Sequence, residues 1–191
     1  MDLALRACDA AARTVRQAGA GLVRHEDEIF SEVDRGEQEL DSIDREMDEA
    51  VVFAITETTV SEARELLTCL KFVIDLERIG DLVSSFSSRS KAVGRRISSE
   101  DTQELLQMLT VLETMVVKAK QAFLSRDLNL AIAVLKADSE IDRMRNLIFI
   151  RHIERAIPSP ARRACRCFSW PTRWNAPATT PRTSRRKSAT T

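Results

Sequence analysis

The chain has 191 residues, of which 43% are hydrophobic, 5% are aromatic and none is Tyr. A chain of this length and composition buries one core or two small ones through aliphatic helix packing, so we expect an all-α protein. No Asp or Glu lies beyond residue 156, where eight Lys and Arg residues lie, so the remaining 21 basic and 29 acidic side chains give the body a net charge of −8. An acidic body repels nucleic acid and attracts cations, which argues against a nucleic-acid-binding role for the folded part.

Apolar periodicity predicts three helices in the first half of the chain. The first spans about residues 1–20, because Gly19 and Gly21 weaken its end. The second spans about residues 26–56. The third begins after a cap at Thr59 or Ser61 and ends near residue 88.

Two further helices are predicted after a linker marked by Gly94 and the Ser98-Ser99 pair. Ser99, followed by acidic residues, opens the fourth helix. The fifth runs over about residues 128–156, and Pro158 and Pro160 end it. Each presents an apolar stripe, formed by Leu105, Leu109, Leu112 and Val116 on the fourth and by Ile132, Leu135, Ile141, Met144 and Ile148 on the fifth.

The second and third predicted helices carry a ladder of acidic residues beside apolar ones. On the second, Glu37, Asp41, Asp44 and Asp48 follow one residue behind a stripe of Leu40, Ile43, Met47 and Ala50. On the third, Leu70, Ile74, Glu77 and Asp81 form one stripe, so the two acids occupy core positions. Carboxylates near a core are costly unless a cation or a hydrogen-bond network neutralises them, so this pattern predicts a bound metal ion.

The four cysteines, Cys8, Cys69, Cys165 and Cys167, are interpreted as free thiols. Two lie within helical patterns, and no secretory signal precedes them. No apolar run approaches the length of a membrane span. We therefore expect a soluble, cytoplasmic protein.

The two halves of the chain repeat with an offset of 101 residues, which aligns the segment 37–41 (EQELD) with 138–142 (DSEID). We expect a three-helix unit at residues 1–97 and an incomplete second unit, with two helices, at residues 98–156. The offset places a third helix of the second unit near residue 178, where Pro171, Pro177 and Pro181 stand instead. Residues 157–191 are therefore predicted to be a disordered basic tail rich in Pro, Ser, Thr and Arg, and the apolar stripes of the fourth and fifth helices to lack part of their cover.

The genetic code offers an explanation of this tail. Read from the third base of each codon, the stretch 168–189 can encode, with synonymous codons, the string LMAHALERAGDHAKNLAEEICH, which contains a near copy of the LERIGD at residues 76–81. In such a shifted frame the last two bases of each codon are set by the following residue, so most amino acids cannot be encoded at any one position. We interpret the tail as a frameshift product that begins between residues 154 and 163. The rival interpretation is a genuine basic arm for nucleic acid or acidic lipid.

Three segments carry a resemblance to the PhoU family of phosphate-uptake regulators. Residues 33–48 (VDRGEQELDSIDREMD) are similar to the first acidic motif of the family, and residues 75–81 (DLERIGD) match its most specific signature. Residues 138–142 resemble the motif of the second repeat. The chain departs at Thr58-Thr59-Val60, where the family often has a Gln-Pro pair. The resemblance covers about residues 1–155 and implies two tandem three-helix bundles, the second lacking its last helix here.

The resemblance also implies a function. Such proteins are cytoplasmic, often homodimeric and not enzymes; they link the phosphate ABC transporter to a membrane sensor histidine kinase, keep phosphate-starvation genes off when phosphate is plentiful, and meet the membrane only through those partners. They bind metal through paired acidic motifs, here Glu37 with Asp41, Glu77 with Asp81, and Asp138 with Asp142. All-carboxylate ligation suits Mg, Mn or Fe ions. Further members of the site or its network are Asp44, Asp48, Asp75 and Arg78.

Two other classes stay open. A ferritin-like di-metal enzyme also places carboxylates inside a helical bundle, but it needs Glu-x-x-His pairs, and neither His25 nor His152 follows a Glu at that spacing. A helical interaction protein without metal is the second alternative, since an acidic pair four residues apart is usually a solvated helix face. On that view Arg78 is a counter-ion to a neighbouring acid.

Overall fold

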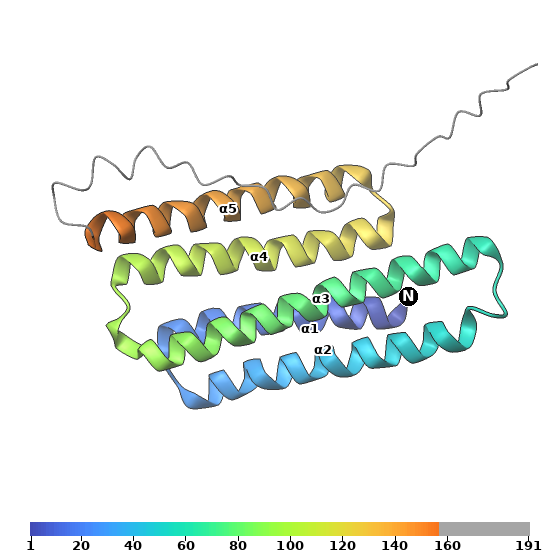
Figure 1. The fold of residues 1–191 in the computed structure, drawn as a ribbon, viewed down its shortest axis with the longest axis horizontal. Helices are drawn as coiled ribbons and strands as arrows, with labels where there is room; N and C mark the ends of the chain where they lie inside the picture. Colours follow the sequence, from blue (N-terminus) through green and yellow to red (C-terminus); the bar gives the residue numbers. More distant parts are fainter. Residues whose placement is uncertain (157–191) are drawn as a thin grey trace, which may run out of the picture. The chain divides into compact units, whose positions relative to one another are not determined.

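The computed structural model describes residues 1–156, and over this range the protein is all α-helical (Figure 1). The helices are α1 (Asp2–Arg24), α2 (Asp27–Ala54), α3 (Val60–Val93), α4 (Ser99–Ser125) and α5 (Leu128–Ala156), with a 3₁₀ turn η1 (Gly94–Arg96) between α3 and α4. The prediction of an all-α fold with five helices is confirmed. Within the described range, no helix combines the length and the hydropathy needed to cross a bilayer.

Two helices begin with side-chain caps that their sequences supply. Thr59, not Ser61, caps α3, because its Oγ1 accepts from the backbone N–H of Glu62 while the Glu62 carboxylate accepts from the backbone N–H of Thr59. α4 begins at Ser99 as predicted, and Ser98 caps it by accepting from the backbone N–H of Asp101 at 3.1 Å.

The predicted end of the first helix near residue 20 is wrong, because α1 continues through both glycines to Arg24. Gly21 packs closely against α2, because a Cβ there would lie 3.0 Å from the ring of Phe30, which would have to shift slightly. The third helix is also longer than predicted and ends at Val93. Near that end, the Nζ atom of Lys91 lies 2.9 Å from a carboxylate oxygen of Asp27, at the start of α2.

The core forms around α1, which contacts α2, α3 and α4. Its buried face consists largely of alanine (Ala4, Ala7, Ala10, Ala11 and Ala18), and small side chains let three neighbouring helices approach one axis. Cys8 and Cys69 are buried free thiols, as predicted, and burial raises the pKa of Cys8 to about 11. The other two cysteines lie outside the described residues.

The apolar stripe of α2 is as predicted at Leu40, Ile43 and Met47, whereas Ala50 is exposed and Val51 is buried in its place. The predicted stripe of α3 is wrong by one residue. Its buried positions are Cys69, Val73, Leu76, Gly80 and Val83, while Ile74 is 43% exposed. One residue rotates a helical side chain by about 100°, so Glu77 and Asp81 lie at the flank of the core and not within it.

The hairpin of α4 and α5 repeats the hairpin of α1 and α2. α1 ends at Arg24 and α4 at Ser125, and α2 begins at Asp27 and α5 at Leu128, so both bounds differ by 101 residues. The connections match in conformation too, since His25 (φ 56°, ψ 35°) and Arg126 (φ 53°, ψ 33°) are the non-glycine residues with positive φ in the described chain. The sequence repeat is therefore also a structural one.

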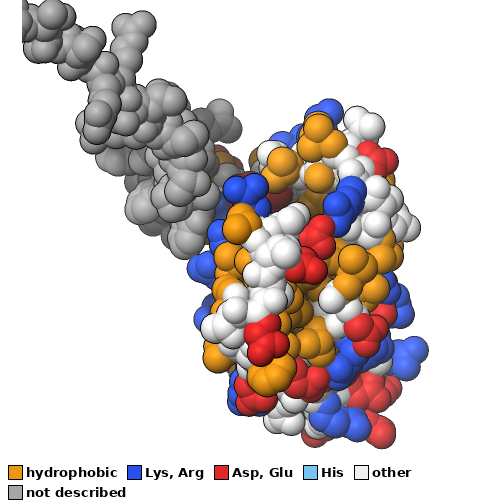
Figure 2. Space-filling view, turned by 90° about the vertical axis from the view of Figure 1, so that its right-hand side faces the viewer, with side chains coloured by type: hydrophobic (Ala, Val, Ile, Leu, Met, Phe, Trp, Pro, Cys, Tyr) orange, Lys and Arg blue, Asp and Glu red, His pale blue; other side chains and the backbone are white. Residues whose placement is uncertain are grey.

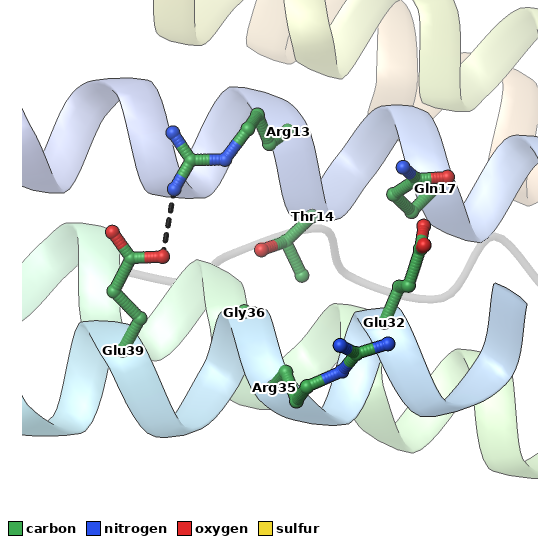
Figure 3. A pocket seen from close by; sticks show the side chains of 7 residues that line it. All are labelled: Arg13, Thr14, Gln17, Glu32, Arg35, Gly36 and Glu39. Atoms are coloured by element: carbon green, nitrogen blue, oxygen red, sulfur yellow. Dashed lines mark hydrogen bonds and ion pairs between the residues drawn. The ribbon is translucent and has the colours of Figure 1, made fainter. Parts of the chain in front are cut away.

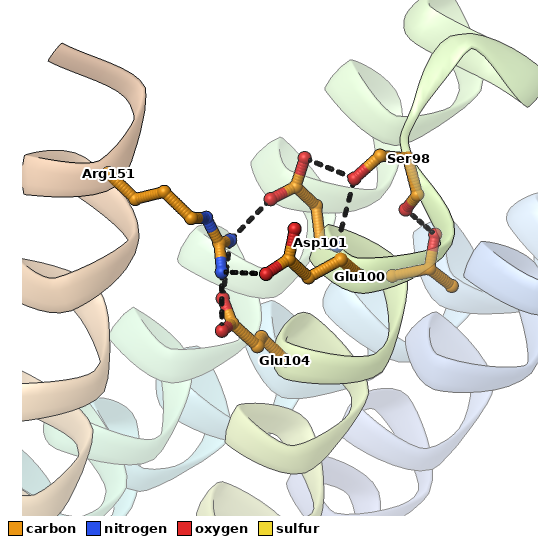
Figure 4. Close-up of polar contacts among 6 residues, drawn as sticks. Ser98, Glu100, Asp101, Glu104 and Arg151 are labelled. Atoms are coloured by element: carbon orange, nitrogen blue, oxygen red, sulfur yellow. Dashed lines mark hydrogen bonds and ion pairs between the residues drawn. The ribbon is translucent and has the colours of Figure 1, made fainter. Parts of the chain in front are cut away.

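α5 runs beside α4 in the opposite direction, and Arg151 joins them (Figures 1 and 4). Its guanidinium lies 2.5 Å from Asp101, 2.6 Å from Glu104 and 3.2 Å from Glu100. The far end of α5 is thereby held to the first turn of α4. Residues Met1–Arg151 form one compact unit in which helices from both sides of the predicted boundary at residue 97 contact α1; a division into two bundles stays a prediction.

Candidate carboxylate site

The carboxylates of α2 and α3 are brought together by an antiparallel register. Asp27 pairs with Lys91, and Ser84 donates to Asp34 at 3.4 Å. From the first of these contacts to the second, α2 advances by seven residues and α3 goes back by seven. Continuing that register places Glu37 opposite Asp81 and Asp41 opposite Glu77.

Gly80 sets how closely the two helices approach beside these acids. A Cβ built on Gly80 would lie 2.5 Å from Cδ1 of Leu40, so the Leu40 side chain, which is buried, would have to move to admit it. The sequence pattern did not identify this residue as functional. The sequence feature that could have identified Gly80 is its place inside a strongly helical motif, because a glycine there costs stability unless close packing requires it.

The electrostatics of the acids agree with this geometry. Burial raises the pKa of Glu37, and the nearby carboxylates of Asp41 and Asp81 raise it further. The pKa of Glu77 is raised in the same way, first by burial and then by Asp81, Asp44, Asp41 and Glu37. Residues of both helices thus repel one another electrostatically. We call the set Glu37, Asp41, Asp44, Glu77 and Asp81 the α2–α3 carboxylate face.

The opposite flank of α2 is built differently. There, Glu39 lies 2.7 Å from Arg13 and Glu46 lies 3.1 Å from Arg6, so carboxylates of α2 are neutralised by arginines of α1. A groove of about 280 Å³ separates the two helices on this side, with Thr14 pointing toward Gly36 at its floor (Figure 3). On the carboxylate face, by contrast, the ion pair formed within residues 1–156 joins Arg45 to Asp41 at 3.9 Å, a long contact within one helix.

Asp44 carries a buried oxygen without a hydrogen bond among the described residues. Its Oδ1 atom is buried and accepts no hydrogen bond, and burial, followed by Asp48 and Asp41, raises its pKa. Oxygen donors of this kind fit a hard cation such as Mg²⁺ or Mn²⁺. Over the described residues, however, no three His, Cys, Asp or Glu side chains converge closely enough to hold a metal ion as they stand. Ion binding would therefore require side-chain rotation on the two helices.

The other residues predicted for the site lie apart from this face or at its edge. Asp48, Asp75 and Arg78 are exposed on the same two helices. Asp138 and Asp142 are exposed on α5, which runs along α4, and Asp142 lies 3.0 Å from Arg145. The structure therefore brings together the first two predicted acidic pairs with Asp44, and does not bring the third pair to them.

The raised pKa values predict how stability depends on pH in metal-free protein. A carboxyl group whose pKa is higher in the folded than in the unfolded state binds more protons when folded, so its contribution to the free energy of unfolding falls as pH rises past about 4.5. We expect Glu77→Gln, which removes the charge, to be more stable than the wild type at pH 7, with a difference that shrinks toward pH 4. Urea unfolding in a chelator at both pH values measures this. A variant less stable at pH 7 would contradict it.

The geometry defines a class of protein, an antiparallel helical bundle with a carboxylate-lined face between two helices. A family model, the PhoU domain, matches residues 4–89 and 105–167. Because these segments make up most of the chain, the protein belongs to the PhoU domain family, and the resemblance seen in its motifs is confirmed.

Individual relatives agree. The chain is 32% identical over 112 residues to the phosphate-specific transport system accessory protein PhoU homolog 1 of Thermotoga maritima, covering 57% of this chain and 48% of that protein. It is 23% identical over 148 residues to the PhoU homolog of Clostridium acetobutylicum, covering 76% and 68%. The homolog of Pseudomonas aeruginosa is 28% identical over 134 residues, with 69% and 55% covered. The chain thus spans about half to two thirds of the length of these relatives.

Proposed function

We propose that this protein is a non-catalytic accessory protein of phosphate uptake, which acts as a negative regulator of the phosphate-starvation response. Its proposed partners are a phosphate ABC transporter and a membrane sensor histidine kinase, which it would meet from the cytoplasm, as a homodimer. The observation that carries the proposal is membership of the PhoU domain family together with relatives named as accessory proteins of phosphate-specific transport.

The proposal includes a metal ion at the α2–α3 carboxylate face. Glu37 and Asp41 would hold it from α2 and Glu77 and Asp81 from α3, with Asp44 as a further oxygen donor. Three features support this: facing carboxylates with raised pKa values, the absence of an interhelical basic partner among the ion pairs recorded for these five side chains in the described range, and the unpaired buried oxygen of Asp44. A divalent cation, here Mg²⁺ or Mn²⁺, would replace the repulsion between the helices by attraction and tighten their contact. Fe is the third candidate ion.

Partner binding can be tested with the full chain. We expect tagged protein to be retained by membranes that contain the phosphate ABC transporter and sensor kinase, and to be retained much less by membranes from which both are deleted. Membranes with one of the two restored identify the partner that is contacted. Equal retention by all of these membranes would contradict the proposed partners.

A further inference from the structure

The surface that carries the α2–α3 carboxylate face changes from acidic to apolar along its length. On α2, the acidic ladder continues past Asp48 at the same helical spacing with Val52 and with Ile55, which follows the helix. On α3, the residues that precede Glu77 at this spacing are all apolar, namely Val60, Ala63, Leu67, Leu70 and Ile74. Carboxylates therefore occupy one end of this surface, and apolar side chains occupy the end at which α2 joins α3.

The register of the two helices brings these apolar residues together. The pairing of Asp27 with Lys91 and of Asp34 with Ser84 fixes an antiparallel register. Continued toward the connection between the helices, this register places Val52 opposite Leu66. Residues of both helices thus form one surface, which we call the α2–α3 apolar face and which consists of Val52, Ile55, Val60, Leu67 and Ile74.

The side chains of this face are exposed. Val52 and Val60 are 73% and 74% exposed, and Leu67 and Ile74 are 41% and 43% exposed. Figure 2 looks onto the end of the molecule at which α2 joins α3, and hydrophobic side chains lie on its surface among charged ones. Contiguous apolar surface of this kind, bordered by polar residues, is typical of an interaction site.

The spacing on α3 indicates which structure fits this face. Val60, Leu67 and Ile74 are seven residues apart, and Ala63 and Leu70 each follow three residues after one of them. These are the a and d positions of successive heptads, the seam along which a second α-helix packs. Within residues 1–156, α3 packs against α1 and α2, and its a and d side chains stay exposed or half-buried. The seam is thus open to a helix.

Charge indicates which helix. The apolar face adjoins the α2–α3 carboxylate face, because the same register places Ile74 opposite Asp44. A helix that follows the seam past Ile74 therefore meets carboxylates, and Lys or Arg at that end complements them. The same face of a second copy presents the same carboxylates and complements them less well. An anionic lipid surface is repelled by them.

We propose that the α2–α3 apolar face is a docking site for an amphipathic α-helix of a partner protein. The apolar stripe of that helix packs on the heptad positions of α3 and on Val52, and basic residues at one of its ends lie over the α2–α3 carboxylate face. This inference goes beyond the proposed function and needs neither a bound metal ion nor a particular membrane partner.

The test measures binding of a synthetic helical peptide to the full chain in a chelator. The peptide has Leu at heptad positions a and d, Ala and Gln at the other positions, and lysines in its last turn. We expect saturable one-to-one binding by calorimetry, with the largest changes of amide signals at Val52 and in residues 60–74. A peptide with glutamates in place of the lysines should bind about tenfold more weakly or worse, because its charges face carboxylates.

Two variants locate the binding. Val52→Gln with Val60→Gln should weaken peptide binding by about tenfold or more, since two apolar contacts are lost. Both side chains are mostly exposed, so this variant should fold. The matched control, Leu135→Gln with Phe149→Gln, removes two side chains of α5 that are 69% and 63% exposed, and it should bind the peptide as the wild type does.

Four results would overturn the proposal: no saturable binding, equal losses in the two variants, equal binding of the glutamate peptide, or signal changes centred on another surface. Two further measurements test other occupants. A dimer that Val52→Gln with Val60→Gln dissociates in sedimentation would mean that a second copy covers the face. Binding to anionic lipid vesicles that the same variant abolishes would mean that a membrane does. Either result overturns the proposal, and none of these results bears on the proposed metal ion, which the chelator removes.

Discussion

Replacing Glu77 with Gln and Asp81 with Asn in one protein is expected to weaken Mn²⁺ binding by the full chain by about 100-fold or more. The two changes remove both α3 carboxylates from the α2–α3 carboxylate face while keeping side-chain volume. Even removal of groups that only orient metal ligands costs about 10- to 100-fold in affinity, so loss of two ligands costs at least as much. The variant is expected to stay folded, because it removes carboxylates that repel one another in the wild type, where this repulsion raises the pKa of Glu37 and Glu77.

A matched control for this variant is Asp138→Asn with Asp142→Asn. This pair has the same spacing on a helix, but in the described structure it lies on α5 and not with the carboxylates of α2 and α3. We expect its effect on calorimetric Mn²⁺ affinity to be much smaller. Equal losses in the two variants, or no loss in the first, would contradict a metal site at the α2–α3 carboxylate face.

Gly36→Ala is expected to lower the free energy of unfolding by about 2 to 3 kcal/mol. The new Cβ would lie 2.2 Å from Oγ1 of Thr14, a buried side chain on α1 whose hydroxyl donates to the carbonyl of Ala10 at 2.9 Å. Rotation of the Thr14 side chain does not relieve this contact, because its Cβ and Cγ2 atoms would themselves lie only 3.2 Å and 3.4 Å from the new atom, so the two helices must move apart. Urea unfolding measures the loss.

Two variants check that this loss comes from the Thr14 contact. Gly19→Ala introduces the same methyl group where the nearest atoms are 3.7 Å away, so it should stabilise the protein by about 0.5 to 1 kcal/mol through helix propensity. Combining Gly36→Ala with Thr14→Ala should recover most of the lost stability. A double variant that is no more stable than Gly36→Ala alone, or a Gly36→Ala protein as stable as the wild type, would contradict a clash with Thr14.

The sequence predicted the buried stripe of α2 and the position of the acids beside it because two independent patterns coincide on this helix. The apolar stripe of Leu40, Ile43 and Met47 identifies the buried side, and the acids follow it by one residue. On α3 the same reasoning failed, since Val73 and Ile74 are both apolar and adjacent, and periodicity alone does not decide which one faces the core. The structure chooses Val73, and the acids move to the flank.

Two other features could not be read from the pattern. The packing of α4 against α1 depends on the alanines of α1, which are compatible with any neighbour and specify none. The grouping of the third acidic pair with the first two depends on where α5 lies, which spacing along the chain does not determine. The repeat, in contrast, was visible in the sequence, because an offset of 101 residues relates both motif and helix bounds.

Paramagnetic broadening by Mn²⁺ tests the central claim most directly, because it locates the ion on the folded chain. At substoichiometric Mn²⁺, the account predicts that the amide signals of Glu37, Asp41 and Asp44 on α2 and of residues 77–81 on α3 broaden first. The signals of Arg6 and Arg13 on α1 provide an internal comparison and should broaden much less, because these arginines pair with Glu46 and Glu39 on the opposite flank of α2. Broadening centred on that flank or on α5, or spread evenly over all acidic residues, would contradict a metal ion held between α2 and α3.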